Sequence, residues 1–253
     1  MNRERGGFDV TRIMNKREIA RVIRYATARA ARTDFKETTR AIAHSQYVIF
    51  RLTIGAGLRC CEIAGLQIGD VVLGTDTPHI YVRKTVGKGG KARRVPLWWD
   101  IGTLEALDEW ITVRRGMGAS DTDPVFCTLQ DQPQYKSRTR RSYPGRPMTR
   151  QAVSHHFMQA IKCLGKQRQK QLNAHGGRHT FAVYMLNAGH SLAEVRDALG
   201  HTNIITTGIY LHPVPEDRTK RGSIYFQGVE EGEDTPPRGP YSVQVERTAA
   251  QTG

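Results

Sequence analysis

The side chains best suited to catalysis gather in the stretch HGGRHTFA, residues 175–182, where His175, Arg178 and His179 lie within five positions. A guanidinium is planar and permanently charged, so an arginine can hold the oxygens of a phosphate. A histidine beside it can move a proton near neutral pH. The combination suits a reaction at a phosphate, whose oxygens gain negative charge as bonds change.

Two other segments carry residues that complete such a reaction. The stretch GAGLRCCEIAGL, residues 55–66, holds Arg59, and LGHTNIITTGIY, residues 199–210, holds His201 and Tyr210. Arginines from two different elements can grip one phosphate from two sides. A phenol can form a covalent phosphotyrosine, which conserves the energy of the broken phosphodiester bond so that the bond can be formed again. Because a phenol normally has a pKa of about 10, cations or a base must activate it.

In this order, the segments resemble the motifs of the tyrosine recombinases, the phage integrase family. The family's first arginine box resembles GAGLRCCEIAGL, and its second box resembles HGGRHTFA. Between them, its lysine-bearing hairpin resembles VGKGGKARRVPL, which contains Lys88, and its third box resembles LGHTNIITTGIY. The motifs occur in family order and at family spacing, and the resemblance covers roughly residues 9 to 213.

The resemblance implies a role for each matched residue. Tyr210 is implied as the nucleophile, His175 as the general base and His201 as a hydrogen-bond partner of the scissile phosphate. Lys88 is implied as the acid that protonates the leaving 5′ oxygen, with Lys91 as the alternative. The implied catalytic set is therefore Arg59, Lys88, His175, Arg178, His201 and Tyr210.

Two further matched residues are expected to support this set. Glu62 stands three positions after the first arginine and is expected to orient it, and His179 matches a supporting histidine. Arginines take the place that magnesium has in nucleases, so we expect no metal and no cofactor. The four cysteines show no metal-ligand spacing, and GKGGK lacks the spacing of a phosphate-binding loop.

The charge of the chain points to a nucleic-acid partner. The formal net charge is +14. Residues 223–253 hold five acids against two arginines, a net of −3, which leaves +17 on residues 1–222. A body this basic favours a nucleic-acid partner, although ribosomal, membrane-surface and heparin-binding proteins share such basicity. The resemblance implies that the partner is double-stranded DNA. The residues expected to contact DNA are Lys84, Lys91, Arg93, Arg94, Lys136, Arg138, Arg140 and Arg141.

The elements that must position these residues follow from local patterns. Apolar periodicity predicts helices over residues 15–32 and 39–53, and again around residues 104–111 and 153–164. Residues 79–97 predict a hairpin, residues 128–147 a surface loop, and Ser191 with Glu194 a capped helix ending near Gly200. A helix is also expected beyond Gly177. The resemblance implies an α+β fold, mainly helical, with a small antiparallel sheet at one edge.

The expected domain organisation departs from the family. Residues 1–213 are expected to form the catalytic domain, without the separate N-terminal core-binding domain that typical members have. Residues 214–253 read as an acidic tail rich in Pro and Gly. By resemblance, that tail either exchanges with a neighbouring protomer or shields the basic surface. The resemblance also implies a dimer on each DNA site and a tetramer in the synapse.

Several classes of function remain open from the sequence. The leading interpretation is a site-specific recombinase acting through a Holliday junction. A type IB topoisomerase-like enzyme or a transposase shares this chemistry, and a non-catalytic DNA-binding module is the alternative without it. No apolar run approaches the length of a membrane span and no secretory signal is evident, so we expect a cytoplasmic protein without a membrane partner.

Overall fold

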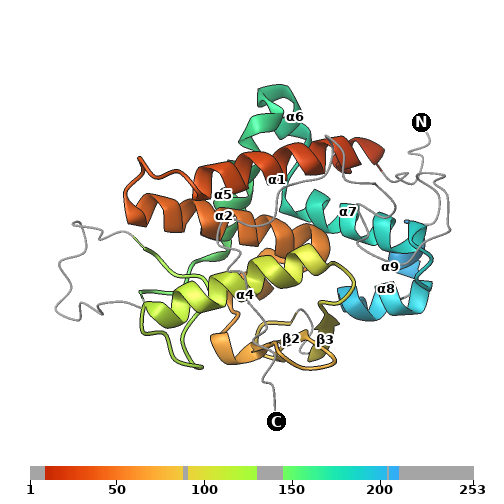
Figure 1. Cartoon of the computed structure of the whole chain (residues 1–253). Helices are drawn as coiled ribbons and strands as arrows, with labels where there is room; N and C mark the ends of the chain where they lie inside the picture. Colours follow the sequence, from red (N-terminus) through yellow and green to blue (C-terminus); the bar gives the residue numbers. More distant parts are fainter. Residues whose placement is uncertain (1–8, 88–90, 130–144, 204, 211–253) are drawn as a thin grey trace, which may run out of the picture.

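Helix α2, Glu37–Gly55, lies at the centre of the fold. Every residue from 43 to 55 is buried. The helix packs against α1, α4, α5 and α7, and Figure 1 shows α1 and α4 on either side of it. Because this part of the helix is covered all round, its buried residues occupy every side, and its sequence shows only a weak amphipathic pattern.

The computed structural model describes residues 9–87, 91–129, 145–203 and 205–210. The described residues form a mainly helical fold with one small sheet, as expected. Short 3₁₀ segments lie at residues 10–12, 68–70 and 161–164. The other helices are α1 (Lys16–Ala30), α3 (Cys60–Ala64), α4 (Ile101–Gly116), α5 (Arg150–Ala160), α6 (Lys166–Gln171), α7 (Ala174–Asn187), α8 (Leu192–Leu199) and α9 (Ile205–Gly208).

The sheet has three antiparallel strands in the order β1 (Val71–Val72), β2 (His79–Val82) and β3 (Arg93–Pro96). Strands β2 and β3 form the predicted hairpin, although its tip at residues 88–90 lies outside the described residues. Ile80 pairs with Val95, and both are buried. Tyr81 pairs with Arg94 on the opposite, exposed face.

Local capping patterns predicted two helices well. Asn15 and Glu18 form the expected capping box at the start of α1, with both hydrogen bonds at 2.9 Å. Ser191 and Glu194 do the same for α8, which ends at Gly200 in the left-handed conformation. Helix α7 begins earlier than predicted, because Asn173 rather than a later residue caps it and accepts from the Gly176 amide.

The predicted surface loop is described only at its two ends. The Thr128 amide donates to the Arg146 carbonyl at 3.0 Å, so the ends lie side by side. Residues 130–144 are outside the described part, as are residues 211–253, which hold the predicted tail. Within the described residues, no helix combines the length and hydrophobicity that crossing a bilayer requires.

Candidate active site

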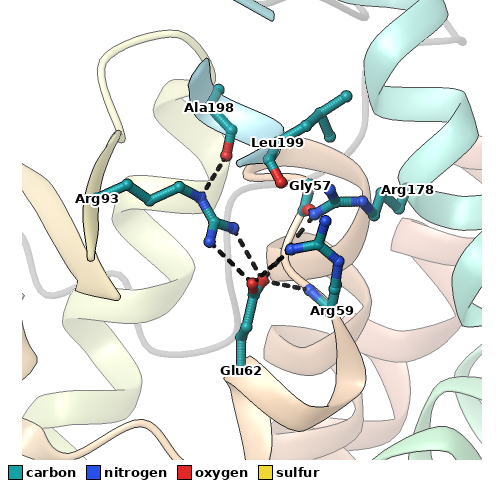
Figure 2. A network of polar contacts seen from close by, with 7 residues as sticks. All are labelled: Gly57, Arg59, Glu62, Arg93, Arg178, Ala198 and Leu199. Atoms are coloured by element: carbon teal, nitrogen blue, oxygen red, sulfur yellow. Dashed lines mark hydrogen bonds and ion pairs between the residues drawn. The ribbon is translucent and has the colours of Figure 1, made fainter. Parts of the chain in front are cut away.

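Two arginines that are far apart in sequence meet at one carboxylate. Arg59 precedes α3 and Arg178 lies in the first turns of α7. An Arg59 guanidinium nitrogen donates to Glu62 Oε1 at 2.8 Å, and Arg178 Nη1 lies 3.9 Å from Glu62 Oε2 (Figure 2). The two guanidinium groups therefore face a common point, as the sequence-based hypothesis requires.

Backbone carbonyls fix the position of Arg178, which is 1% exposed. Its guanidinium donates to the Gly57 carbonyl at 2.5 Å and to the Leu199 carbonyl at the end of α8. Gly57 has a φ of 61°, and a Cβ at this position would meet the Phe181 ring at 2.4 Å. Only glycine therefore lets the chain present this carbonyl to the guanidinium.

Burial destabilises the charged form of Arg178. Burial and the neighbouring Arg59 lower the pKa of Arg178 to about 9, while Glu62 opposes the shift. At neutral pH the group remains charged. A buried cation beside a second cation gains most when an anion reaches it, which is the property expected of a phosphate-binding site.

Glu62 is 1% exposed and is held as a carboxylate. Burial alone would raise the pKa of Glu62. Hydrogen bonds and charge from Arg93, the Arg59 amide at 2.8 Å and the charge of Arg178 together hold the pKa below its ordinary value. Glu62 thus contacts Arg59, the residue that it was expected to orient, and also two arginines that the prediction did not join to it.

Arg93 differs from its expected placement. The sequence grouped it with the DNA contacts, but its side chain is only 10% exposed. Its two terminal nitrogens donate to both Glu62 oxygens at 2.8 Å, and its Nε donates to the Ala198 carbonyl at 2.8 Å (Figure 2). All of its nitrogens therefore bind protein groups in this structure.

His201 follows the αL residue Gly200 and is half-buried. Its Nδ1 lies 2.9 Å from the Thr207 hydroxyl, which fixes the orientation of the ring. Burial and the charges of Arg178, Arg59 and Arg93 lower the pKa of His201 to about 4. At neutral pH the ring is therefore neutral and lies within the field of the arginine cluster.

Tyr210 is buried, and its side chain contacts His179. The phenolic oxygen lies 2.6 Å from His179 Nδ1. His175 packs edge-on against His179, with ring centroids 4.3 Å apart, and is itself exposed. Burial raises the pKa of Tyr210 to about 12, although Arg178 and Arg59 pull it down. Both arginines therefore lie close enough to act on the phenol.

His179 is neutral for the same reason as His201. Burial, His175 and Arg178 lower the pKa of His179 to about 4. A neutral imidazole has one donor and one acceptor nitrogen, and the tautomer with a bare Nδ1 accepts a hydrogen bond from the Tyr210 hydroxyl. Sequence reasoning treated His179 only as a supporting residue and missed this contact.

The remaining predicted residues divide between the described and the undescribed parts of the chain. Lys84, Lys91 and Arg94 lie on or beside the hairpin and are exposed. The residues outside the described part are Lys88, Lys136, Arg138, Arg140 and Arg141. Among the described residues, no three His, Cys, Asp or Glu side chains are grouped so that they could hold a metal ion.

A signal for the inward orientation of Arg93 was present in the sequence. Side chains alternate along a strand, so Arg93 shares the face of Val95, whereas Arg94 lies opposite. The contact between His201 and Thr207 had no comparable signal.

Comparisons with known proteins agree with the family resemblance of the sequence motifs. A family model described as the phage integrase family matches residues 13–216, which is most of the chain. Tyrosine recombinase XerC of Chlorobaculum tepidum is 34% identical over 170 residues, covering 65% of this chain and 44% of the relative. A tyrosine recombinase of Pseudothermotoga lettingae is 31% identical over 173 residues, covering 68% and 51%. The chain thus spans about half the length of these relatives.

Solved structures show the same fold. A crystal structure of XerA recombinase is 26% identical, with a TM-score of 0.59 over 80% of this chain and 60% of that one. A post-cleavage complex of XerH recombinase with a palindromic difH substrate is 23% identical, with a TM-score of 0.58 over 81% and 50%.

Proposed function

The chain belongs to the phage integrase family, and on this premise we propose that it is a site-specific DNA recombinase that cuts and rejoins strands through Tyr210. One observation carries the proposal. Arg59 and Arg178, from separate elements, converge on Glu62, and both act electrostatically on His201 and Tyr210. This arrangement can hold one phosphate beside a nucleophile.

The proposed cleavage step exchanges one phosphodiester for another. The Tyr210 oxygen attacks the scissile phosphorus, and the bond from phosphorus to the 5′ oxygen breaks. The 3′ end is then a phosphotyrosine, and the departing 5′ oxygen takes a proton from Lys88, which lies outside the described residues. Attack by the 5′ hydroxyl of a partner strand reverses the step, so two paired sites pass through a Holliday junction without an energy source.

The arginines would stabilise the charge that develops on the non-bridging oxygens. Each guanidinium offers two parallel donors to a phosphate, and Arg178 is already desolvated. Preorganised donors in a water-poor site lower a barrier by about 3–4 kcal/mol each, because they need not reorganise as charge appears. Glu62 would keep both guanidinium groups aimed at the phosphate.

His201 has the protonation state that a phosphate donor needs. Its ring is neutral, so one nitrogen carries a proton. Because the Thr207 hydroxyl lies 2.9 Å from Nδ1, the hydroxyl can donate to Nδ1 and leave the proton on Nε2. We propose that Nε2 donates this proton in a hydrogen bond to the scissile phosphate.

Tyr210 must lose its proton as it attacks, because its pKa of about 12 keeps the phenol protonated. The family resemblance assigns the general base to His175. In this structure His179 is the ring in contact with the hydroxyl, and His175 packs on His179. We propose that DNA binding moves the phenol from His179 towards the phosphate, where His175 accepts its proton.

The two histidines can be separated by the pH dependence of cleavage. If His175 is the base, His175→Ala lowers the single-turnover cleavage rate and removes the fall of that rate at low pH. His179→Ala should retain this fall. The reverse pattern would assign the base to His179.

The proposed partner is double-stranded DNA. We propose that the protein binds each DNA site as a dimer and forms a tetramer in the synapse. The basic body and the exposed Lys84, Lys91 and Arg94 support DNA binding. Neutralised phosphates release counterions, so affinity should fall steeply with salt.

A nicked substrate tests the proposal. When cleavage releases a short fragment, the covalent complex is trapped, and we expect it with the wild type but not with Tyr210→Phe. Arg59→Ala should reduce trapping by orders of magnitude, whereas a pure binding module would lose little beyond one phosphate contact. A complex that survives in Tyr210→Phe would end the proposal. Plasmid relaxation without recombinant products would instead favour a topoisomerase-like function.

A further inference from the structure

We infer that Arg93 is a positioning residue. Its contacts hold the phosphate-binding arginines in a fixed position relative to the hairpin and to the turn before His201. The inference rests on the proposed function and adds a residue to it. Arg93 touches none of the reacting groups in the proposed step. It acts through Glu62 and through the C-terminal end of α8.

The contact between Arg93 and Glu62 has the geometry of a fixed pair. Both terminal nitrogens bind both carboxylate oxygens, each at 2.8 Å. Such a bidentate pair restricts rotation of the carboxylate, which a single contact does not. Arg59 uses the same two oxygens, one through its amide and one through its side chain. The orientation that Arg93 gives to Glu62 is therefore passed to Arg59.

A single carboxylate is shared by three guanidinium groups, so removing one changes the other two. Arg93 makes the largest favourable contribution to the lowered pKa of Glu62. Without Arg93, Glu62 could rotate towards Arg178, which now lies 3.9 Å away, and could hold it in place of the phosphate. Arg93 thus leaves Arg178 available to the substrate.

The other end of Arg93 reaches the turn that presents His201. Its Nε donates to the Ala198 carbonyl, next to the Leu199 carbonyl that Arg178 holds. Gly200 has a φ of 62°, and a Cβ there would lie 3.1 Å from the Arg93 side chain. Arg93 therefore packs directly against the turn between α8 and His201.

Strand β3 makes Arg93 a link between sites on separate elements. Arg93 pairs with Val82 of β2, and Lys88 lies between these two strands in the sequence. A shift of the hairpin on DNA would move Arg93, and Arg93 would move Glu62 and the Ala198 carbonyl. We infer that placement of the hairpin on DNA is coupled in this way to the alignment of Arg59 and His201.

The test uses Arg93→Ala and Arg93→Lys, with Arg83→Ala as a matched control. Arg83 also pairs with a carboxylate, that of Asp70, and donates to a carbonyl, that of Gly65. These contacts lie outside the network of Figure 2. DNA affinity is measured by mobility shift. Single-turnover trapping on the nicked substrate is then measured at saturating DNA, so that binding and alignment are read separately.

We expect Arg93→Ala to lower the trapping rate on the order of 10- to 100-fold, the usual effect of losing a partner that orients a functional group. DNA affinity should stay within about threefold, because Arg93 is not a phosphate contact. Arg93→Lys should recover part of the rate, since an ammonium restores the charge but not the bidentate geometry. Arg83→Ala should match the wild type in rate.

Opposite results would overturn the inference. A trapping rate for Arg93→Ala equal to that of the wild type would do so, and so would a loss of affinity with an unchanged rate, which would make Arg93 a DNA contact. Arg93→Lys, which keeps the charge, serves if Arg93→Ala fails to fold.

A spectroscopic readout separates this inference from the proposed function. In nitrogen NMR of the guanidinium groups, Arg93→Ala should shift the Nε signals of Arg59 and Arg178, and Arg83→Ala should not. If the wild type traps no DNA, the proposed function fails and these signals still test the positioning role. Unchanged Arg59 and Arg178 signals would refute it.

Discussion

Replacing Glu62 by glutamine tests the charge balance of the site. Each Glu62 oxygen accepts two hydrogen bonds, one from Arg59 and one from Arg93. In either orientation, the glutamine amide nitrogen would face two donors. Two charged hydrogen bonds are worth about 1.5–3 kcal/mol each, which gives about 3–6 kcal/mol. Breaking a buried ion pair typically costs about 3–5 kcal/mol.

Urea unfolding at pH 7 measures this loss. We expect Glu62→Gln to lower the free energy of unfolding by about 3–5 kcal/mol. The control is Asp121→Asn, which removes the carboxylate of an ion pair with Arg115 whose side chains are 71% and 47% exposed. That variant should lose about 0–1 kcal/mol, because water screens the pair.

The pH dependence gives the sign of the effect. The folded-state pKa of Glu62 lies below the ordinary value of 4.5, so its contribution is present above pH 4.5 and is lost as pH falls through the folded value. The difference between the wild type and Glu62→Gln should therefore shrink in acid. A difference below about 1 kcal/mol at pH 7, or one that does not change in acid, would refute the charge balance described here.

Three other perturbations have defined outcomes. Gly200→Ala should lower the free energy of unfolding by about 1–2 kcal/mol, because Gly200 has a φ of 62°, whereas Gly116→Ala, in open space, should not destabilise the fold. Burial lowers the pKa of His44 from 6.5 to about 4, so the wild type should lose up to about 3 kcal/mol of stability from this residue as pH falls below about 6.5. In thermal scans, His44→Gln should lose less stability over the same pH range. An equal dependence of stability on pH in the two proteins would count against the assignment. Arg94→Ala should reduce the slope of log affinity against log salt by about 0.9 if Arg94 contacts one phosphate, and an unchanged slope would remove it from the DNA contacts.

The parts of the fold that local chemistry determines were predictable from the sequence. The capping pair Asn15 and Glu18, with an apolar stripe behind it, predicts α1 closely. The glycine and lysine turn between β-branched stretches predicts the hairpin of β2 and β3. Helix α2 was predicted two residues short at each end. At its start, Lys36 makes no side-chain capping hydrogen bond, and towards its end residues 43–55 are buried on every side and give little periodic signal.

The site was predictable in its members and less so in its contacts. The motifs named Arg59 and Arg178, but 119 residues separate them, and only the tertiary fold brings both to Glu62. Strand alternation could have shown that Arg93 turns inward. No local pattern could show that the Tyr210 hydroxyl meets His179, because that contact depends on how α9 folds back on α7.

The structure of a complex with a nicked DNA duplex tests the central claim most directly. The measured quantities are the distances from Arg59 and Arg178 to the scissile phosphate, and from the Tyr210 oxygen to its phosphorus. The account predicts that both guanidinium groups bind non-bridging oxygens of that one phosphate, with the phenolic oxygen opposite the 5′ oxygen that leaves. Guanidinium groups bound to different phosphates, or a phosphate beyond the reach of Tyr210, would contradict it.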